Sequence, residues 1–339
     1  MLHFPQRDHA SPKVETPDPF NQFNHLLEQD LEQVEKEITR RLQSQVPAVT
    51  QVAQHLVASG GKRLRPILLL LVARALDYHG SRAIPMAAAV EFVHTATLLH
   101  DDVIDHAQLR RGRPSCNALW DNKMSVLVGD FLYCQVSTII AEDGDLNILK
   151  CITDATTQTT EGEVLEITKS RDLRVREAEY FKIIEFKTGM LMSAATEMGA
   201  ILAQADPKVQ ASMRQFGMDL GMAFQLADDV LDYTSVEEEF GKAKGVDLKE
   251  GKLTLPLLVA LDRCEAKEAE TIRQGILNAS SELFKEVLKI LKKYQAIEHS
   301  LEWAEKKLSS AREQLACLPD GEYREALETF TYYVTQRRK

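Results

Sequence analysis

Two apolar segments that end in the same acidic pattern constrain the fold of this chain more than any other feature. Glu91–Asp105 reads EFVHTATLLHDDVID, and Met218–Asp232 reads MDLGMAFQLADDVLD. Both predict helices that are apolar on nearly every side, which is typical of buried helices. Their offset of 127 residues is too long for a stacked repeat. The pair therefore predicts two halves of one helical bundle that face a shared site.

Each acidic pattern is D-D-x-x-D, whose outer carboxylates project from one helix face about one turn apart. The clusters are Asp101, Asp102 and Asp105, and Asp228, Asp229 and Asp232. Like charges at this spacing repel, and burying a carboxylate costs several kcal/mol unless the charge is compensated. Mg²⁺ resolves this conflict, because it binds through one or two carboxylates together with substrate phosphates. We therefore expect several Mg²⁺ ions and a diphosphate between the clusters.

Two alternatives explain acidic clusters without catalysis. A single D-D-x-x-D is also compatible with a solvated helix end, although two copies that each follow an apolar helix weigh against that interpretation. A helical bundle that binds Ca²⁺ is the other alternative. The EF-hand pattern of alternating oxygen ligands around a central glycine is missing, which weighs against it.

Basic residues beside glycines accompany the acidic clusters. GGKRLRP (Gly60–Pro66) precedes an apolar helix, and LRRGRP (Leu109–Pro114) directly follows the first cluster. Glycine allows close approach of a ligand, a helix N-terminus favours anions, and arginine binds phosphate with two donors. The predicted phosphate ligands are Lys62, Arg65, Arg110 and Arg111. A basic surface loop and surface salt bridges are the alternatives.

Further polar residues stand at helical spacing from the clusters or close to them in sequence. His94 lies seven residues before Asp101, two turns along the same face, where a ligand role competes with that of a hydrogen-bonded core histidine. The other predicted donors are Lys187, Thr188, Gln225, Lys242 and Lys252. Each is a weak signal alone, and together they would supply a highly charged phosphate site.

The rest of the chain predicts an all-α fold. Only 16 Gly and 11 Pro interrupt 339 residues, and no β-branched alternation lies between turn residues. We expect helices over Asn21–Gln45, Ile67–Leu76, Ile84–His106, Ala118–Glu142, Asn147–Lys169, Arg174–Ala203, Pro207–Tyr233 and Leu253–Asp262, followed by three or four amphipathic helices. Residues 1–20 are rich in Pro, His and Asp, and we expect them to form a disordered arm. No linker rich in Gly, Ser or Pro divides the rest of the chain, so we expect one all-α domain over 21–339.

Charge and cysteine content limit the partners and the compartment. A formal net charge of −10 weighs against nucleic-acid binding and against electrostatic docking on anionic membranes. Five scattered cysteines without a C-x-x-C fit reduced thiols in the cytoplasm. We find neither a signal peptide nor an apolar run of about 20 residues, so at most transient membrane contact is expected.

These motifs together resemble the trans-isoprenyl diphosphate synthases of the polyprenyl synthetase family. The matching segments are GGKRLRP, EFVHTATLLHDDVIDHAQLRRGRP, SVLVGDFLY, EGEVLE, FKTG, AFQLADDVLDYT and GKAKGVDLKEGKLTLP, with QRRK at the end of the chain. The resemblance implies the isoprenoid synthase fold, a bundle of antiparallel helices around a central cavity, usually in a homodimer. GKAKGVD differs from the many relatives that have Asn before this glycine, but it keeps Lys242 and Asp247.

The resemblance also implies the reaction, a head-to-tail condensation of isopentenyl diphosphate with an allylic diphosphate. Both aspartate clusters would hold Mg²⁺, with Asp101, Asp105, Asp228 and Asp232 as ligands. The residues Arg110, Lys187, Thr188, Gln225, Lys242 and Lys252 would complete the allylic subsite, and Lys62, Arg65, His94 and Arg111 would hold isopentenyl diphosphate. The allylic C–O bond ionises, the double bond of isopentenyl diphosphate attacks the cation, and a proton is lost to the departing diphosphate.

Product length depends on the helix that leads to the first cluster. Ala96 and Thr97 are small at the level where short-chain members of the family commonly carry an aromatic residue, and Phe92 and Val93 form the next turn. One turn spans about 5.4 Å, close to one prenyl unit, so Phe92 and Val93 are the next candidates to limit the chain. EFVHTATLLHDDVID is most similar to the bacterial medium- to long-chain members of the family, and this resemblance implies a product of about 35 to 50 carbons, a quinone side-chain precursor. The alternatives are a farnesyl or geranylgeranyl synthase, a class I terpene cyclase and a noncatalytic metal-binding helical subunit.

Overall fold

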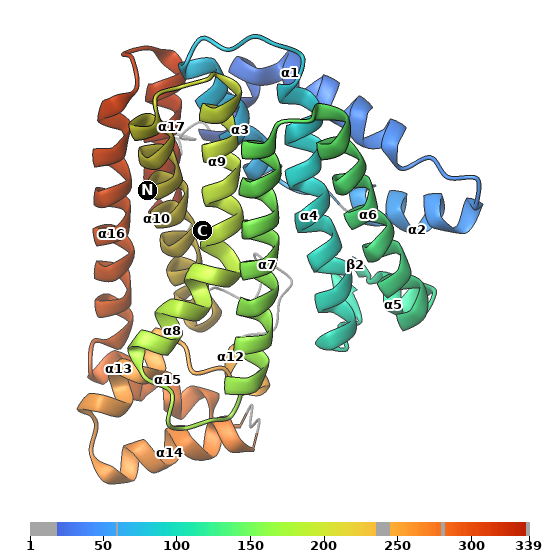
Figure 1. Ribbon diagram of the computed structural model, residues 1–339. Helices are drawn as coiled ribbons and strands as arrows, with labels where there is room; N and C mark the ends of the chain where they lie inside the picture. Colours follow the sequence, from blue (N-terminus) through green and yellow to red (C-terminus); the bar gives the residue numbers. More distant parts are fainter. Residues whose placement is uncertain (1–18, 59, 235–244, 279–281, 337–339) are drawn as a thin grey trace, which may run out of the picture.

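The computed structural model describes residues 19–58, 60–234, 245–278 and 282–336, which form α-helices joined by short connections (Figure 1). The helices are α1 (Pro19–Arg41), α2 (Pro47–Ala58), α3 (Leu64–Ala75), α4 (Ala83–Ile104), α5 (Cys116–Leu119), α6 (Asn122–Asp143), α7 (Leu146–Lys169), α8 (Glu177–Ile184), α9 (Met190–Leu202), α10 (Pro207–Thr234), α12 (Val246–Glu250), α13 (Leu255–Arg263), α14 (Ala266–Leu277), α15 (Phe284–Lys293), α16 (Ala296–Gln314) and α17 (Glu322–Gln336). A π-helical turn (Glu185–Gly189) connects α8 to α9, and a 3₁₀ turn (Leu315–Cys317) follows α16. The predicted all-α class is confirmed.

The helices that carry the acidic clusters run in the same direction. α10 packs between α9 and α16, and α4 packs against α6. Figure 1 shows α4 and α10 descending toward the same end of the bundle, where α8 and α12 also lie. The C-terminal ends of α4 and α10, and with them both clusters, therefore belong to one end of the molecule.

Burial explains why these helices are apolar on every side. The stretch 66–73 of α3 is buried at every position, and in α4 every residue from Met86 to Val93 is buried. α3 is enclosed by α4, α9 and α17. A helix enclosed in this way has no solvent-facing stripe, which is why its sequence lacks the usual amphipathic pattern.

Two of the predicted helices are interrupted. The segment Ala118–Glu142 was expected as one helix, but α5 ends at Leu119 and α6 begins at Asn122. Asp121 caps α6, since its Oδ1 accepts a hydrogen bond of 2.8 Å from the backbone N of Met124. The segment Arg174–Ala203 was also expected as one helix. It starts only at Glu177, and the π-helical turn interrupts it.

The expectation of no strands is wrong at one place. Strands β1 (Leu109–Arg110) and β2 (Arg113–Pro114) form a short antiparallel hairpin directly after the first acidic cluster. Its two turn residues, Arg111 and Gly112, have φ values of 54° and 74°. Positive φ at both central residues is the requirement of a tight two-residue hairpin turn.

The predicted N-terminal arm falls mostly outside the described residues. Residues 1–18 are not described, and the last two residues of the expected arm, Pro19 and Phe20, belong to α1. The predicted ligand Lys242 also lies outside the described residues.

Candidate functional site

The middle aspartate of the first cluster is buried and held by a cation. Asp102 has no exposed surface, and its Oδ1 accepts a hydrogen bond of 2.8 Å from Nε of Arg110 in the hairpin. Asn117 adds two hydrogen bonds from its Nδ2, at 3.1 Å to the backbone oxygen of Asp102 and 3.0 Å to that of Ala107. The structure thus brings Asp102 and Arg110 together as a pair that fastens the hairpin to the end of α4.

The outer aspartates of the first cluster lie in a negative environment. Burial, and next the charge of Glu163, raise the pKa of Asp101 to about 7, although Lys187 opposes this effect. Burial also raises the pKa of Asp105, against the opposing charge of Lys252. Carboxylates in this position would bind a divalent cation readily, because it would offset the charge that now disfavours ionisation.

Two lysines and three glutamates alternate between the clusters. Nζ of Lys187 lies 2.6 Å from Oε2 of both Glu163 and Glu166. Nζ of Lys252 lies 3.3 Å from Oε2 of Glu166 and 2.8 Å from Oε2 of Glu250. This chain of ion pairs connects α7, the π-helical turn and the segment after α12.

The π-helical turn places Lys187 close to α7. A Cβ atom at Gly162 would lie 2.6 Å from the backbone N of Lys187 and 2.8 Å from Cβ of Phe186. Only glycine fits such a close approach without a shift of the backbone. The extra residue of a π turn is frequent at functional sites, and here it turns Lys187 and Thr188 toward the acidic clusters.

The second cluster has its middle aspartate buried as well, but its partners are neutral. Oδ2 of Asp229 accepts a hydrogen bond of 2.5 Å from the Tyr180 hydroxyl, and Oδ1 accepts one of 2.8 Å from Nε2 of Gln225. Thr188 in turn donates to Oε1 of Gln225 at 2.8 Å. Burial raises the pKa of Asp229 to about 7. Thr188 and Gln225, both predicted as site residues, are brought together here.

Asp232 connects the end of α10 to α12. Its Oδ1 accepts a hydrogen bond of 3.0 Å from the backbone N of Val246, and its Oδ2 accepts one of 3.2 Å from the backbone N of Asp247. Burial, followed by the charges of Asp229 and Asp232, raises the pKa of Asp247. Asp228, by contrast, is half-buried. The second cluster therefore gains a further acidic group, Asp247, for which no site role was predicted from the sequence.

The donor set fits Mg²⁺ bound together with a diphosphate. Within the described parts of the chain, no three His, Cys, Asp or Glu side chains converge closely enough to enclose an ion by themselves. Mg²⁺ does not need such a cage, because it keeps several waters and usually takes one or two carboxylates plus phosphate oxygens. The carboxyl groups of Asp101, Asp105 and Asp229 are hard oxygen donors whose pKa burial raises, so a bound cation would favour their ionised form.

A separate basic region contains three of the four residues predicted for isopentenyl diphosphate. Burial, and then the charges of Arg65 and Arg111, lower the pKa of His94 well below its ordinary value. Burial also lowers the pKa of Arg65 to about 10, and its buried Nε has no hydrogen-bond partner among the described atoms. Such an arrangement of cations around a neutral histidine fits a bound anion.

The glycines of GGKRLRP bring Lys62 to the same region. A Cβ atom at Gly61 would lie 2.8 Å from the guanidinium of Arg111, so the two basic segments meet at this point. Nζ of Lys62 hydrogen-bonds the Tyr333 hydroxyl of α17 and lies 4.8 Å from the centre of its ring. Of the four predicted residues, Lys62 therefore lies in the segment before α3, Arg65 on α3, His94 on α4 and Arg111 in the turn of the hairpin.

The predicted chain-length residues occupy α4 before the first cluster. Phe92, Val93 and Ala96 are fully buried, and Thr97 is half-buried with its hydroxyl donating at 2.8 Å to the backbone oxygen of His94. The hydroxyl of Thr97 is therefore satisfied within its own helix.

Sequence reasoning missed four polar residues of this region: Glu163, Glu166, Tyr180 and Asp247. EGEVLE places Glu163 and Glu166 at i and i+3, one face of a helix, and this spacing was the available signal. Asp247 lies two residues after Gly245 in GKAKGVD, a segment that carries the family resemblance, but no site role was predicted for it. Tyr180 stands in an ordinary amphipathic segment, and no sequence signal marks it.

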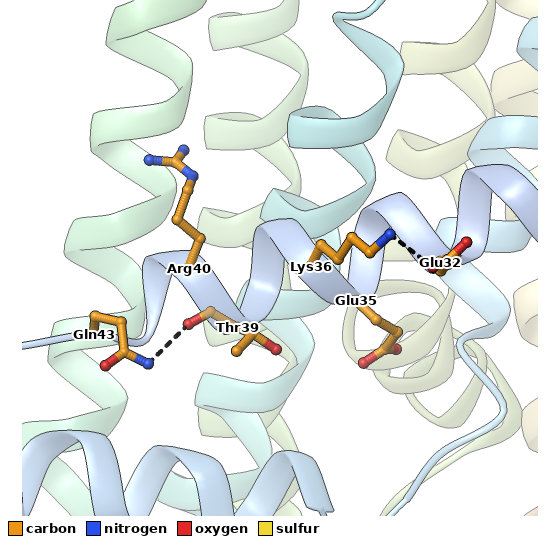
Figure 2. A pocket seen from close by; sticks show the side chains of 6 residues that line it. All are labelled: Glu32, Glu35, Lys36, Thr39, Arg40 and Gln43. Carbon is orange, nitrogen blue, oxygen red and sulfur yellow. Dashed lines mark hydrogen bonds and ion pairs between the residues drawn. The ribbon is translucent and has the colours of Figure 1, made fainter.

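A groove of about 470 Å³ lies elsewhere, on the surface of α1. Figure 2 shows its lining residues Glu32, Glu35, Lys36, Thr39, Arg40 and Gln43 spread along one helix. Glu32 and Lys36 form an exposed ion pair of 2.6 Å, which is ordinary for a solvated helix face. None of the predicted site residues lines this groove.

Comparisons with known proteins find relatives over most of the chain. The profile of the Polyprenyl synthetase family matches residues 46–293. The octaprenyl diphosphate synthase of Haemophilus influenzae is 38% identical over 318 residues, which cover 94% of this chain and 97% of that protein.

Solved structures agree over nearly the whole chain. A decaprenyl diphosphate synthase from Rhodobacter capsulatus superposes with a TM-score of 0.91 at 37% identity, covering 95% of this chain and 100% of the other. A polyprenyl synthase from Caulobacter crescentus, complexed with calcium and isoprenyl diphosphate, superposes with a TM-score of 0.90 at 39% identity, covering 94% and 98%.

Proposed function

This chain belongs to the polyprenyl synthetase family and is a trans-prenyltransferase that makes a long-chain polyprenyl diphosphate, and we propose that its two acidic clusters hold Mg²⁺ on the allylic diphosphate. The observation that carries this proposal is the chain of ion pairs through Glu166. That glutamate contacts both Lys187 and Lys252, whose charges act on Asp101 and Asp105 of the first cluster. The charge of Glu166 also acts on Asp229 of the second cluster. One highly charged ligand can therefore interact with both clusters.

The resident ions supply charge neutralisation of the diphosphate that leaves the allylic carbon. Asp101, Asp105, Asp228 and Asp232 are the proposed ligands. The polyprenyl synthase from Caulobacter crescentus was crystallised with calcium and isoprenyl diphosphate, which supports a hard divalent cation beside a diphosphate here. Calcium and magnesium share a preference for carboxylate and phosphate oxygens.

Lys187 and Lys252 bind the allylic diphosphate directly in this proposal. Both ammonium groups are held by glutamates in the ligand-free chain, so an entering diphosphate replaces carboxylate partners that are already in place. The lysines are thereby pre-oriented, which lowers the entropy cost of binding the substrate. Thr188, Gln225 and Arg110 complete the subsite, and Lys242 is the further ligand expected by resemblance.

Isopentenyl diphosphate binds at the basic region in this proposal. Lys62, Arg65 and Arg111 contact the diphosphate, and neutral His94 donates one hydrogen bond to it. Excess positive charge and the unpaired buried Nε of Arg65 support an anion at this place. The two substrates then meet near the end of α4, where burial of the surrounding helix excludes water from the allylic cation.

We further propose a product of about 35 to 50 carbons, a quinone side-chain precursor, whose tail extends along α4. Ala96 leaves space at the first level before Asp101, while Phe92 and Val93 stand one turn further, about 5.4 Å away. The names of the relatives support this range, since they include octaprenyl and decaprenyl diphosphate synthases.

A homodimer in the cytoplasm is the proposed state of the enzyme. Among the described helices, α6 alone has the length and apolar composition of a membrane-spanning helix, and 39% of that window is buried within the chain. Leu119, Val126 and Leu127 are exposed on or beside α6. A second copy covering this face would remove apolar surface from water without a membrane, and only the released lipid product would bring the enzyme to one transiently.

Incubation of the purified chain with farnesyl diphosphate, isopentenyl diphosphate and Mg²⁺, followed by chromatographic sizing of the products, tests this function. We expect all-trans prenyl diphosphates of about 35 to 50 carbons, the range that the names of the relatives support. A cyclic hydrocarbon, no extension, or products that stop at geranylgeranyl diphosphate would contradict the proposal. EDTA is the matched control and should abolish extension.

A further inference from the structure

The buried carboxylate of Asp229 is held on both oxygens by uncharged donors. The Tyr180 hydroxyl donates to Oδ2 at 2.5 Å, and the amide of Gln225 donates to Oδ1 at 2.8 Å. Asp229 is 5% exposed and Tyr180 3%. A buried carboxylate is usually paired with a cation, so a pair of neutral donors at this position requires an explanation.

Neutral donors fix the direction of a carboxylate without cancelling its charge. A lysine or arginine in the place of Tyr180 would neutralise Asp229 and weaken the attraction of the second cluster for cations. A hydroxyl orients the carboxylate and offsets part of its desolvation without adding a positive charge beside Asp228. Hydrogen bonds of this kind to the carboxylates of metal sites typically contribute to metal affinity.

Tyr180 comes from α8, which precedes the π-helical turn that carries Lys187. A continuous path of hydrogen bonds runs from Thr188 through Gln225 to Asp229 and ends at Tyr180. It begins beside the lysine of the proposed allylic subsite and ends at the second cluster. A shift of Asp229 would therefore change the position of the acidic end of α10 relative to the π-helical turn.

The Tyr180 hydroxyl is suited to a permanent donor role. Burial, and then the charge of Asp229, raise the pKa of Tyr180 well above its ordinary value, so the hydroxyl stays protonated at working pH. The ring itself is fixed by packing, since it lies edge-on to Phe181 at 5.5 Å, and Phe181 contacts Trp303 of α16 at 5.0 Å. The ring packs in the core, whereas the hydroxyl hydrogen-bonds Asp229.

We propose that Tyr180 is a positioning residue of the second acidic cluster, whose hydroxyl orients Asp229 so that the end of α10 binds Mg²⁺ and diphosphate. The inference rests on the proposed function, because it assigns Tyr180 a task only if the cluster holds Mg²⁺. It predicts that the hydroxyl matters for metal binding and much less for isopentenyl diphosphate, which binds at the other, basic region.

Tyr180→Phe tests this, with Tyr233→Phe as the matched control. Tyr233 is another buried tyrosine of the same region, but its hydroxyl lies 3.4 Å from the hydroxyl of Thr254, which is long for a hydrogen bond between hydroxyls. The first readout is the rise in Tm on addition of pyrophosphate at increasing Mg²⁺, which needs no turnover. We expect Tyr180→Phe to require about tenfold more Mg²⁺ for half of the rise, as is typical when such a supporting hydrogen bond is lost. The KM for isopentenyl diphosphate should stay within about twofold.

Each outcome decides a separate question. A Mg²⁺ requirement of Tyr180→Phe equal to that of the wild type, or an equal increase in Tyr233→Phe, overturns the role of Tyr180. If the wild type shows no rise in Tm with Mg²⁺ and pyrophosphate, the proposed function itself fails. If Tyr180→Phe does not fold, fluorotyrosine at position 180 keeps the ring and changes only the strength of the donor. An unchanged Mg²⁺ requirement then overturns the proposal.

Discussion

The two acidic clusters have the same sequence pattern, and the fold uses them differently. In both, the middle aspartate is buried, but Asp102 pairs with the cation Arg110 whereas Asp229 pairs with the neutral donors Tyr180 and Gln225. The first arrangement compensates the charge and anchors a hairpin. The second orients the carboxyl group without a cation and connects it to the π-helical turn. A repeated motif therefore predicts the kind of ligand, while the neighbours of each copy determine how its charge is distributed.

The largest expected effect is the loss of activity on substitution of an outer aspartate. Asp101→Asn and Asp228→Asn should each lower kcat by at least about a hundredfold, because each removes a proposed Mg²⁺ ligand whose contribution to the leaving diphosphate is several kcal/mol. Stability should be retained, since neither substitution leaves a buried charge without a partner. Steady-state kinetics and thermal melts measure the two quantities. Asp154→Asn, at an exposed position of α7, is the control, and wild-type kcat in both variants would contradict the assignment.

Arg110→Ala tests the first cluster, in which a cation pairs with the buried middle aspartate. It leaves the carboxylate of Asp102 buried without a cation, so the free energy of unfolding should fall by about 3 kcal/mol. Arg113→Ala, on the other strand of the same hairpin and exposed, should cost less than about 0.5 kcal/mol. Adding Asp102→Ala to Arg110→Ala should restore part of the loss. Urea titration measures all three, and equal costs for Arg110→Ala and Arg113→Ala would exclude the proposed anchoring role.

The uncompensated carboxylates predict a pH dependence of the metal-free protein. Burial first raises the pKa of both Asp101 and Asp229 to about 7, so in the folded state they hold protons that the unfolded chain has already released. Their contribution to stability is present in full below the ordinary pKa of aspartate, about 4, and is lost as pH rises through about 7. In EDTA, Tm should therefore be higher at pH 6 than at pH 8, and Asp101→Asn should reduce the difference. A Tm that increases from pH 6 to pH 8 would argue against it.

The smallest expected effect concerns the helices before the clusters. α4 carries Ala96 and Thr97 at the positions where α10 carries Ala223 and Phe224. Only the α4 side is proposed to face the growing chain, so Ala96→Phe should shorten the product by one or more prenyl units, since one turn of about 5.4 Å matches one unit. Phe224→Ala should leave product length unchanged. Chromatographic sizing of the products checks both variants. An active Ala96→Phe variant with wild-type products would show that Ala96 does not limit product length.

Much of the fold was predictable because burial leaves a simple trace in the sequence. The apolar segments around Ile67 and Ala88 predict enclosed helices, and α3 and α4 are enclosed. The break before α6 is absent from the sequence prediction because Asp121 lies within the segment Ala118–Glu142, and only the structure shows its side chain capping a new helix. The hairpin was missed because two residues per strand give no alternation, although Arg111 and Gly112 mark its turn.

The candidate site was predictable in its charges and less so in its pairings. Charge-rich motifs named both clusters and Lys187, but no spacing rule pairs Arg110 with Asp102 across the turn of the hairpin. Tyr180 lies 49 positions before Asp229 in the chain, and their contact exists only because α8 packs against α10. Long-range contacts of this kind depend on tertiary packing, which local periodicity does not encode.

Binding of pyrophosphate with Mg²⁺, measured by titration calorimetry on the wild type, Asp101→Asn, Asp228→Asn and the double variant, tests the central claim most directly. If the clusters hold one shared ligand, each single variant loses most of the binding free energy and the double variant loses little more, because the two effects are coupled. Additive losses, or binding that depends on only one cluster, would contradict a shared site.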